Sequence, residues 1–264
     1  MNSVLVRLLC CFIPFKEKRK RFRQKMLHPY AFSDTAVWEK LSENNEIEIN
    51  NEDRKKVSVT ISGKNNKIII GRLSKTCRGS IKISISGDNC TVAIEEGVSV
   101  SQNVSVLMGQ LHHNFGPIKN ATLYIGKHTS FEQCSIILFN SNSSVEIGKK
   151  CMFAYGITIF NTDAHPIYDV NSGEIINKVG SVIVRDHCWI GAKSTILKNV
   201  ELASDTIVGW GSVVSRKYYS SSGFSAPPSN CIIAGNPARI VRLGVTWDSN
   251  GSNGYIQNEN KYGK

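Results

Sequence analysis

An apolar side chain recurs at every sixth position along much of this chain. The longest run contains Val184, Ile190, Ile196, Leu202, Val208 and Val214. Shorter runs with the same spacing precede it: Ile94, Val100 and Val106; Ile125, Phe131 and Ile137; and Ile147, Phe153 and Ile159. Further upstream, residues 57–70 and 81–94 match each other at a shift of 24 positions. Internal periodicity of this kind is a stronger guide to the fold than local propensity.

A spacing of six does not fit the period of an amphipathic helix, and it only partly resembles the alternation of a strand. It fits a chain that turns a corner every six residues and places one apolar side chain from each of three faces in a central column. Stacked coils of this kind pair their short strands in parallel, about 4.8 Å apart. The sequence therefore predicts an all-β parallel solenoid. Gly148, Gly191 and Gly211 follow inward positions, where we expect the corner to need a permissive backbone.

Three interruptions of the repeat are expected to form protruding loops: residues 107–124, 160–181 and 217–230. Loops that leave a solenoid at one corner are where binding sites usually lie. The second interruption contains Asp163 and His165, so it is the first place to look for chemistry.

The net charge of +11 is concentrated near the N-terminus. The first 25 residues hold eight lysines and arginines against Glu17 and contribute +7, which leaves +4 for the rest of the chain. A mildly basic body suits an anionic small ligand as well as a nucleic acid. No RNA- or DNA-binding motif accompanies this charge, so no nucleic-acid partner is expected.

The apolar stretch VLVRLLCCFIPF near the N-terminus is too short to span a bilayer. It lacks the basic residues before it and the small-residue cleavage site after it that mark a secretory signal. With the following KEKRKRFRQK it predicts a short N-terminal helical segment, for which two interpretations stay open. Residues 1–25 could bind an anionic membrane surface, or they could form a basic helix that is solvated or packed against its own protein.

The eight cysteines include no CxxC pair. Cys90, Cys134 and Cys188 stand at apolar or repeat positions, as reduced core residues of a cytosolic protein do. We therefore expect a cytoplasmic location, peripheral on the inner face of the cell membrane if the basic segment binds lipid, and no metal site.

The stretch CWIGAKSTILKNVELASDTIVGWGSVVSRK, followed by IIAGNPARIV, resembles the hexapeptide-repeat acyltransferases with a left-handed β-helix. It is most similar to their O-acetyltransferases that modify capsule, lipopolysaccharide O-antigen, galactoside or maltose hydroxyls. The resemblance covers residues 57 to about 243 in fold and is motif-specific over 145–243. It implies a left-handed coil, acetyl-CoA as the acyl donor, and a homotrimer with active sites in the clefts between subunits.

Acyl transfer to an alcohol requires the hydroxyl to lose its proton as it attacks, and histidine is a natural general base near neutral pH. In the resembling family the histidine of an HP pair has this role, which implies the same for His165. Pro166 favours an extended backbone at His165. Asp163 could orient the ring, hold its positive charge or contact a sugar. Trp189 matches a family tryptophan near the reacting centre, although core packing would also explain it.

The resemblance also implies, position by position, which residues contact acetyl-CoA. They are Ala192, Trp210, Ser215, Arg216, Lys217, Arg239 and Arg242. An arginine can hold a phosphate with two parallel hydrogen bonds, which lysine cannot. A solvated basic end of the solenoid is the alternative for these cations. Trp210 departs from the family, whose members usually have a small residue there, so the thioester channel could differ or the indole could stack on the donor.

Candidate acceptor-binding residues are His113, Asn140 and Asn142, although His113 could also be solvated. The sugar-contacting Asn and Asp of the galactoside branch align near Cys134 and Asn142, so that acceptor pattern is not kept. A glycan larger than a free galactoside is therefore expected.

The remaining coil histidines, His128 and His187, are expected to be structural. The zinc-dependent γ-class carbonic anhydrases share the resembling fold and use three histidines from adjacent chains. Their histidine pair separated by four residues is missing here, which disfavours a zinc enzyme.

Four segments are expected. They are a basic amphipathic segment (1–27), a cap or linker (28–56), the β-helix acyltransferase domain (57–243) and a disordered tail (244–264). The implied activity is acetyl-CoA-dependent O-acetylation of a cell-surface glycan, a capsular polysaccharide or O-antigen sugar. Two alternatives stay open: an N-acetyltransferase of a nucleotide-linked amino sugar, and a non-catalytic solenoid scaffold.

Overall fold

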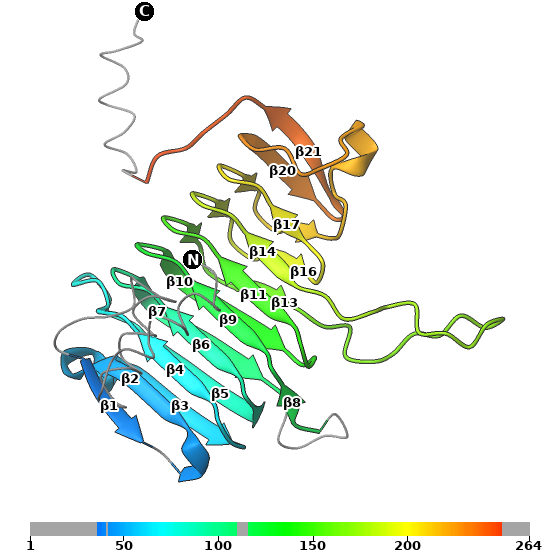
Figure 1. The fold of residues 1–264 in the computed structure, drawn as a ribbon. Coiled ribbons are helices and arrows are strands. Elements are labelled where there is room, and N and C mark those ends of the chain that lie inside the picture. The colour runs from blue at the N-terminus through cyan, green and yellow to red at the C-terminus, as the bar shows by residue number, and fades with distance from the viewer. Residues whose placement is uncertain (1–35, 41, 110–115, 250–264) are drawn as a thin grey trace, which may run out of the picture.

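Short parallel strands stack into three-sided coils along the chain (Figure 1). The computed structural model describes residues 36–40, 42–109 and 116–249. Face 1 is an eight-stranded sheet made of β1 (Ala36–Lys40), β2 (Glu46–Asn50), β4 (Lys67–Ile70), β6 (Thr91–Ile94), β9 (Thr122–Ile125), β11 (Ser144–Ile147), β14 (Val182–Val184) and β17 (Glu201–Leu202). Within it only β1 runs antiparallel to its neighbour.

The other two faces belong to a second, 13-stranded sheet that bends around a corner. Face 2 carries β12 (Met152–Phe153), β15 (Trp189–Ile190), β18 (Ile207–Val208) and β20 (Cys231–Gly235). Face 3 carries β13 (Ile157–Phe160), β16 (Thr195–Leu197) and β19 (Val213–Val214). The long β10 (Ser130–Leu138) pairs with β12 at its start and with β13 further on, so it runs from face 2 to face 3.

The N-terminal coils have longer strands than the C-terminal coils, and the two ends of the solenoid differ from its regular middle part. The longer strands are β3 (Val57–Ser62), β5 (Ser80–Asp88) and β7 (Ser99–Met108), with the short β8 (Ile118–Lys119) beside the end of β5. Three short 3₁₀ helices are η1 (Ser42–Asn44), η2 (Asn51–Lys56) and η3 (Ser220–Ser222). At the C-terminal end β21 (Ala238–Leu243) folds back antiparallel onto β20.

The six-residue period places its apolar side chains in one continuous core. Ile190, Ile196 and Val208 are each 1 % exposed or less, and Phe131 stacks on Phe153 with ring centroids 4.7 Å apart. Successive coils keep one register, because Ile196 of β16 lies between Ile159 and Val214 of its neighbours. Each coil therefore covers the apolar edge of the previous one, as in other solenoids.

Every corner of the C-terminal coils contains a residue with a left-handed backbone. These residues also recur every six positions: His187, Lys193, Asn199, Asp205, Gly211 and Lys217, with φ between 56° and 68°. We name the corners by the faces they join: corner 1–2 holds His187, corner 2–3 holds Lys193, and corner 3–1 holds Asn199.

Most of these left-handed positions are not glycines. The expectation that Gly148, Gly191 and Gly211 provide a permissive backbone at the corners is therefore correct only for Gly211. Gly211 has φ +68°, as expected of a permissive corner, but Gly148 and Gly191 are not in the left-handed region. A Cβ on Gly148 would lie 2.7 Å from the carbonyl carbon of Arg185, and one on Gly191 would lie 2.5 Å from the carbonyl oxygen of Val208. Glycine is needed at these two sites because the next coil passes too close for any side chain.

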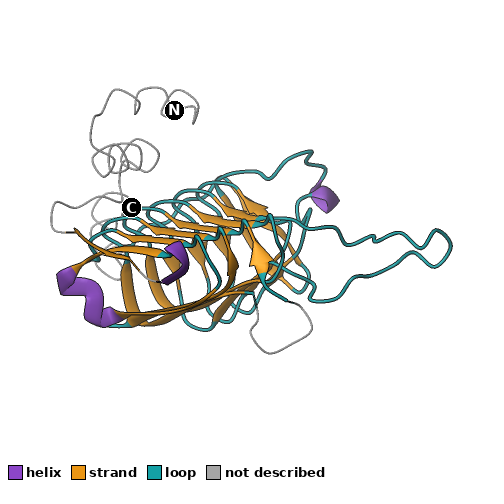
Figure 2. Cartoon of the chain, turned by 60° about the horizontal axis from the view of Figure 1, so that its bottom comes forward, coloured by secondary structure: helices purple, strands orange, loops and turns teal. Residues whose placement is uncertain are grey.

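The first two interruptions lie between face 3 and face 1, and the third lies between β19 on face 3 and β20 on face 2. The longest, which we call the arm (residues 161–181), extends away from the solenoid between β13 and β14 (Figures 1 and 2). An antiparallel bridge joins Tyr168 to Ile175 near its tip. There the backbone N–H groups of Ser172 and Asn171 bind the carboxylate of Asp169 and hold the pKa of Asp169 below its ordinary value. The arm therefore has hydrogen-bonded structure of its own.

Several expectations fall wholly or partly outside the described residues. The N-terminal helical segment and His113 are among the residues not described, as is the tail beyond Ser249. Of the expected tail, residues 244–249 are described, and the indole N–H of Trp247 donates to the carbonyl oxygen of His187 at 2.7 Å. None of the helices in the described ranges is long and apolar enough to cross a membrane.

Candidate active site

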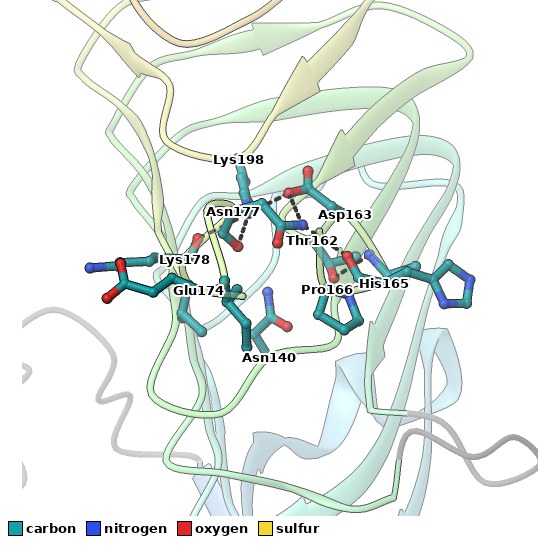
Figure 3. Close-up of a pocket in the computed structure, with 12 residues that line it drawn as sticks. Asn140, Thr162, Asp163, His165, Pro166, Glu174, Asn177, Lys178 and Lys198 are labelled. Carbon is teal, nitrogen blue, oxygen red and sulfur yellow. Dashed lines mark hydrogen bonds and ion pairs between the residues drawn. The ribbon is translucent and has the colours of Figure 1, made fainter. Parts of the chain in front are cut away.

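Corner 3–1 carries a pocket of about 700 Å³ at the base of the arm (Figure 3). The pocket is lined by Asn140, Thr162, Asp163, Ala164, His165, Pro166, Glu174, Ile175, Asn177, Lys178, Val179 and Lys198. Three of the candidate residues, Asn140, Asp163 and His165, are thus brought together from two coils. Asn142 lies at the same corner but accepts a hydrogen bond from Asn120 (2.9 Å) and does not line the pocket.

His165 is exposed at the start of the arm, with its backbone held on both sides. Its N–H donates to the carbonyl oxygen of Asp163 at 2.7 Å, and its carbonyl oxygen accepts from Nδ2 of Asn177 at 2.8 Å. Ala164 between them adopts a left-handed φ of 62°. The turn presents the imidazole to solvent at the edge of the pocket (Figure 3).

The carboxylate of Asp163 contacts Lys198 of the next coil and Asn177 of the returning branch of the arm. Its Oδ2 pairs with Nζ of Lys198 at 2.5 Å and accepts from Nδ2 of Asn177 at 2.9 Å. Figure 3 shows the imidazole of His165 pointing away from this carboxylate. Asp163 therefore fixes the arm in this structure, and its hydrogen bonds act on the backbone around His165.

Ser215 and Arg216, two of the expected acetyl-CoA contacts, also lie at corner 3–1. They line a second pocket of about 380 Å³ together with Asp163 and Lys198. Arg216 also borders a third pocket of about 430 Å³ on the face 1 side. No acidic side chain in the described part of the chain forms an ion pair with Arg216. The guanidinium is therefore available for an anionic ligand.

Ala192 and Trp210 lie at a different corner, 2–3. Trp210 is 63 % exposed and meets Tyr155 edge to face, with ring centroids 5.2 Å apart. Ala192 stands between them in the stack of coils and is 1 % exposed. Nζ of Lys193 lies 6.0 Å from the centroid of the Tyr155 ring. Within one chain this aromatic surface and the pocket beside His165 are separate.

Trp189 lies on face 2 next to corner 1–2 and is 37 % exposed, so it is not a core residue. Its ring centroid is 5.9 Å from that of Trp247, which stacks on His187 at 4.5 Å. Nδ1 of His187 in turn lies 2.7 Å from Oδ1 of Asp205. The structural role expected for His187 fits these contacts, since they hold the chain after β21 against the solenoid.

The remaining cations expected to contact acetyl-CoA are exposed near the C-terminal end of the solenoid. Lys217 follows Arg216 with a left-handed φ of 58°, and Arg239 and Arg242 lie on β21. Among the residues that the structure describes, no cluster of three or more His, Cys, Asp or Glu side chains could hold a metal ion.

Among the pocket residues that were not anticipated from the sequence, Asn177 and Lys198 make the hydrogen bonds that hold the arm. Lys198 could have been found from the period, because it stands two residues after Ile196 as Asn161 stands after Ile159 and Arg216 after Val214. It therefore lies at the corner from which the arm leaves. No pattern marks Asn177, because its place follows from the shape of the arm.

Several proteins of known name are similar to this chain, although no family model matches it. A polysialic acid O-acetyltransferase of Neisseria meningitidis is 35 % identical over 140 residues, which are 53 % of this chain and 59 % of that protein. Another from Escherichia coli O1:K1 is 28 % identical over 129 residues, 49 % of this chain and 39 % of that protein. The matched part thus spans less than two thirds of the length of either relative.

Two crystal structures share the fold over most of their length. The polysialic acid O-acetyltransferase OatWY is 30 % identical, with a TM-score of 0.52, over 77 % of this chain and 89 % of that one. The polySia-specific acetyltransferase NeuO superposes with a TM-score of 0.59 at 24 % identity, over 79 % of this chain and 96 % of that one. The expected fold class, a left-handed parallel β-helix with protruding loops, is confirmed by these neighbours. The chain belongs to the hexapeptide-repeat acyltransferases.

Proposed function

We propose that this protein is an acetyl-CoA-dependent O-acetyltransferase that modifies a hydroxyl of a cell-surface glycan. One observation carries the proposal. The histidine of the HP pair, His165, lies at the edge of a pocket of about 700 Å³ in a chain 30 % identical to a polysialic acid O-acetyltransferase. A capsular or O-antigen glycan is the proposed acceptor, and the sialic acid polymer of the named relatives is the first to test.

In the proposed reaction His165 removes the proton of the acceptor hydroxyl while the oxygen attacks the thioester carbonyl of acetyl-CoA. A C–O bond forms, and the oxyanion of the tetrahedral intermediate accepts hydrogen bonds from backbone N–H groups beside the pocket. The C–S bond then breaks, and His165 returns the proton to the departing thiolate. The products are an acetyl ester and free CoA.

The direct test incubates the full-length protein with acetyl-CoA and a panel of capsular and O-antigen glycans, including polysialic acid. Mass spectrometry should detect an added acetyl group that mild alkali releases, because esters hydrolyse under these conditions and amides do not. An alkali-stable acetyl group on an amino sugar would contradict O-acetylation. Absence of both acetyl transfer and acetyl-CoA binding would favour a non-catalytic scaffold.

Arg216 is proposed to bind a phosphate of acetyl-CoA, since it borders two pockets and pairs with no described acid. Replacing Arg216 with glutamine should raise the KM for acetyl-CoA about tenfold or more, because a charge-assisted hydrogen bond contributes about 1.5–3 kcal/mol. The kcat should change little. Initial-rate kinetics measure both constants. Arg78→Gln, at an exposed arginine on a distant coil, is the matched control. A KM that equals that of the control would remove Arg216 from the donor site.

A homotrimer with active sites between subunits is proposed because one chain keeps the two halves of the expected site apart. The half with Trp210 lies at corner 2–3 and the half with His165 at corner 3–1. The arm also carries six of the ten large apolar side chains that are exposed in the described ranges: Ile167, Tyr168, Val170, Ile175, Ile176 and Val179. Such a surface suits contact with a second copy of the chain.

Subunit complementation tests this assembly. The single variants His165→Ala and Trp210→Ala, one in each half, should both be much less active than the wild type. After the two are unfolded and refolded together, mixed trimers should regain a measurable fraction of wild-type activity, because some clefts combine two intact halves. Light scattering on the eluting protein measures the mass of the assembly. A monomeric mass, or a mixture no more active than its parts, would contradict shared sites.

A cytoplasmic location, peripheral on the inner face of the membrane, is proposed from the reduced state expected of the cysteines and from the basic segment. Six cysteines lie in the described residues, and all six are buried and free. Burial raises the pKa of the Cys134 thiol, which keeps it protonated and unreactive. Binding of residues 1–25 to anionic lipid stays a prediction from the sequence alone.

A further inference from the structure

Lys198 is a nearly buried lysine at the point where the arm joins the solenoid. Its side chain is 10 % exposed, and it follows β16 on the coil next to the one from which the arm leaves. An ammonium group has three N–H donors and no acceptor. Each donor of Lys198 has a partner: Asp163 Oδ2 at 2.5 Å, and the carbonyl oxygens of Asn177 and Lys178 at 2.9 Å each.

These three partners come from the two ends of the arm. Asp163 lies where the chain enters the arm, and Asn177 and Lys178 lie where it returns (Figure 3). One cation from a neighbouring coil therefore holds both ends together. A buried lysine is costly unless it is paired and hydrogen-bonded, so full pairing here indicates a definite arrangement of the arm.

Asn177 connects these contacts to the backbone of His165. Its Nδ2 donates to Asp163 Oδ2 at 2.9 Å and to the carbonyl oxygen of His165 at 2.8 Å. Its Oδ1 accepts from the N–H of Ile167 at 2.7 Å. The side-chain amide of Asn177, on the returning branch of the arm, therefore bonds Asp163, His165 and Ile167, three alternate residues of the outgoing branch. Together with Lys198, it fixes the backbone on either side of His165.

We infer that Lys198 is a positioning residue, which acts through Asp163 and Asn177 to hold the imidazole of His165 in the place where it meets the acceptor hydroxyl. This inference rests on the proposed function for its effect on rate. Lys198 does not touch the reacting atoms in this role. Its ion pair and its two hydrogen bonds are with the arm, so its replacement removes no hydrogen bond between the coils.

Lys198→Met should lower kcat about 100-fold, the loss expected when a catalytic group moves by about 1 Å. The KM for acetyl-CoA should stay within about threefold of the wild-type value. Lys198→Arg, which keeps the charge and the donors, should recover a large part of kcat. Lys127→Met is the matched control, since it removes a lysine paired with Glu96 at corner 1–2, away from the arm. Its kcat should stay within about twofold of wild type.

Hydrogen–deuterium exchange gives a second measurement that does not depend on activity. In Lys198→Met the amide protons of His165 and Ile167 should exchange faster, while that of Thr195, bonded to Ser212 in the coil, should not. Asp163→Asn, which leaves the carbonyl contacts of Lys198 in place, should show the same pattern to a smaller extent.

The outcomes separate this inference from the proposed function. Wild-type kcat and wild-type exchange in Lys198→Met would overturn the positioning role while leaving the acetyltransferase proposal intact. Faster exchange in the arm together with wild-type kcat would also overturn it, because the arm would then be fixed without consequence for His165. A wild-type protein that transfers no acetyl group at all would overturn the proposed function, whatever the exchange shows.

Discussion

Replacement of His165 by alanine is expected to lower kcat for acetyl transfer by about 10²–10⁴-fold, the usual contribution of a general base. Without the imidazole the acceptor hydroxyl has to lose its proton to water as it attacks the thioester. The exposed side chain makes no contribution to the core, so the melting temperature should stay within about 1 °C of wild type. Acetyl-CoA should still bind, because Ser215 and Arg216 are unchanged.

Three comparisons make this result specific. His128→Asn changes a histidine at corner 1–2 whose φ of 57° asparagine tolerates, and it should keep full turnover. His165→Gln preserves a similar volume and should be as inactive as His165→Ala, since an amide is not a base. The rate is measured from the release of CoA thiol, with binding of acetyl-CoA followed separately by calorimetry. Undiminished turnover by His165→Ala would require another base.

The fold could be predicted from the sequence because one pattern, the apolar residue at every sixth position, determines the solenoid. Each inward position fixes the next one six residues later, so the run from Val184 to Val214 specifies the faces, the coils and their register together. The period says less about the N-terminal coils, where β5 and β7 run on without a break into the corner. It also gives no handedness, which came from the resemblance and is confirmed by the solved neighbours.

The site could be predicted in part. His165 and Asp163 were found because they interrupt the repeat, and Arg216 because of the motif around it. The same six-residue arithmetic separates Trp210 from Arg216, since residues six apart lie at successive corners. Asn177 could not be predicted, because its position depends on how the arm folds back on itself. The role of Asp163 stayed open, since two residues of sequence separation say nothing about the direction of a side chain, and in the structure its carboxylate contacts Lys198 and Asn177.

Gly148→Ala is expected to destabilise the fold by about 3 kcal/mol, at the upper end of the usual range for overpacking. The new Cβ would lie 2.6 Å from Oδ1 of Asp186 and 2.7 Å from backbone atoms of Arg185 and Asp186 on the next coil. Backbone cannot rotate out of the way as a side chain can. The coils would have to separate, which would weaken the 2.7 Å hydrogen bond from the Gly148 N–H to the Val184 carbonyl oxygen. The melting temperature should fall by about 6–12 °C.

Gly211→Ala is the matched comparison, because it tests conformational freedom without crowding. Gly211 has φ +68° and no atom within 4 Å of an added Cβ, so alanine there should cost only the left-handed strain of about 1 kcal/mol. Gly211→Asn should cost less still, since Asn199 adopts the same conformation at the equivalent place of another corner. Thermal unfolding of Gly148→Ala, Gly211→Ala and Gly211→Asn shows whether crowding by the next coil or the left-handed backbone makes glycine more important. A larger drop for Gly211→Ala than for Gly148→Ala would mean that backbone freedom at the corners, and not the spacing of the coils, limits the stability of this β-helix.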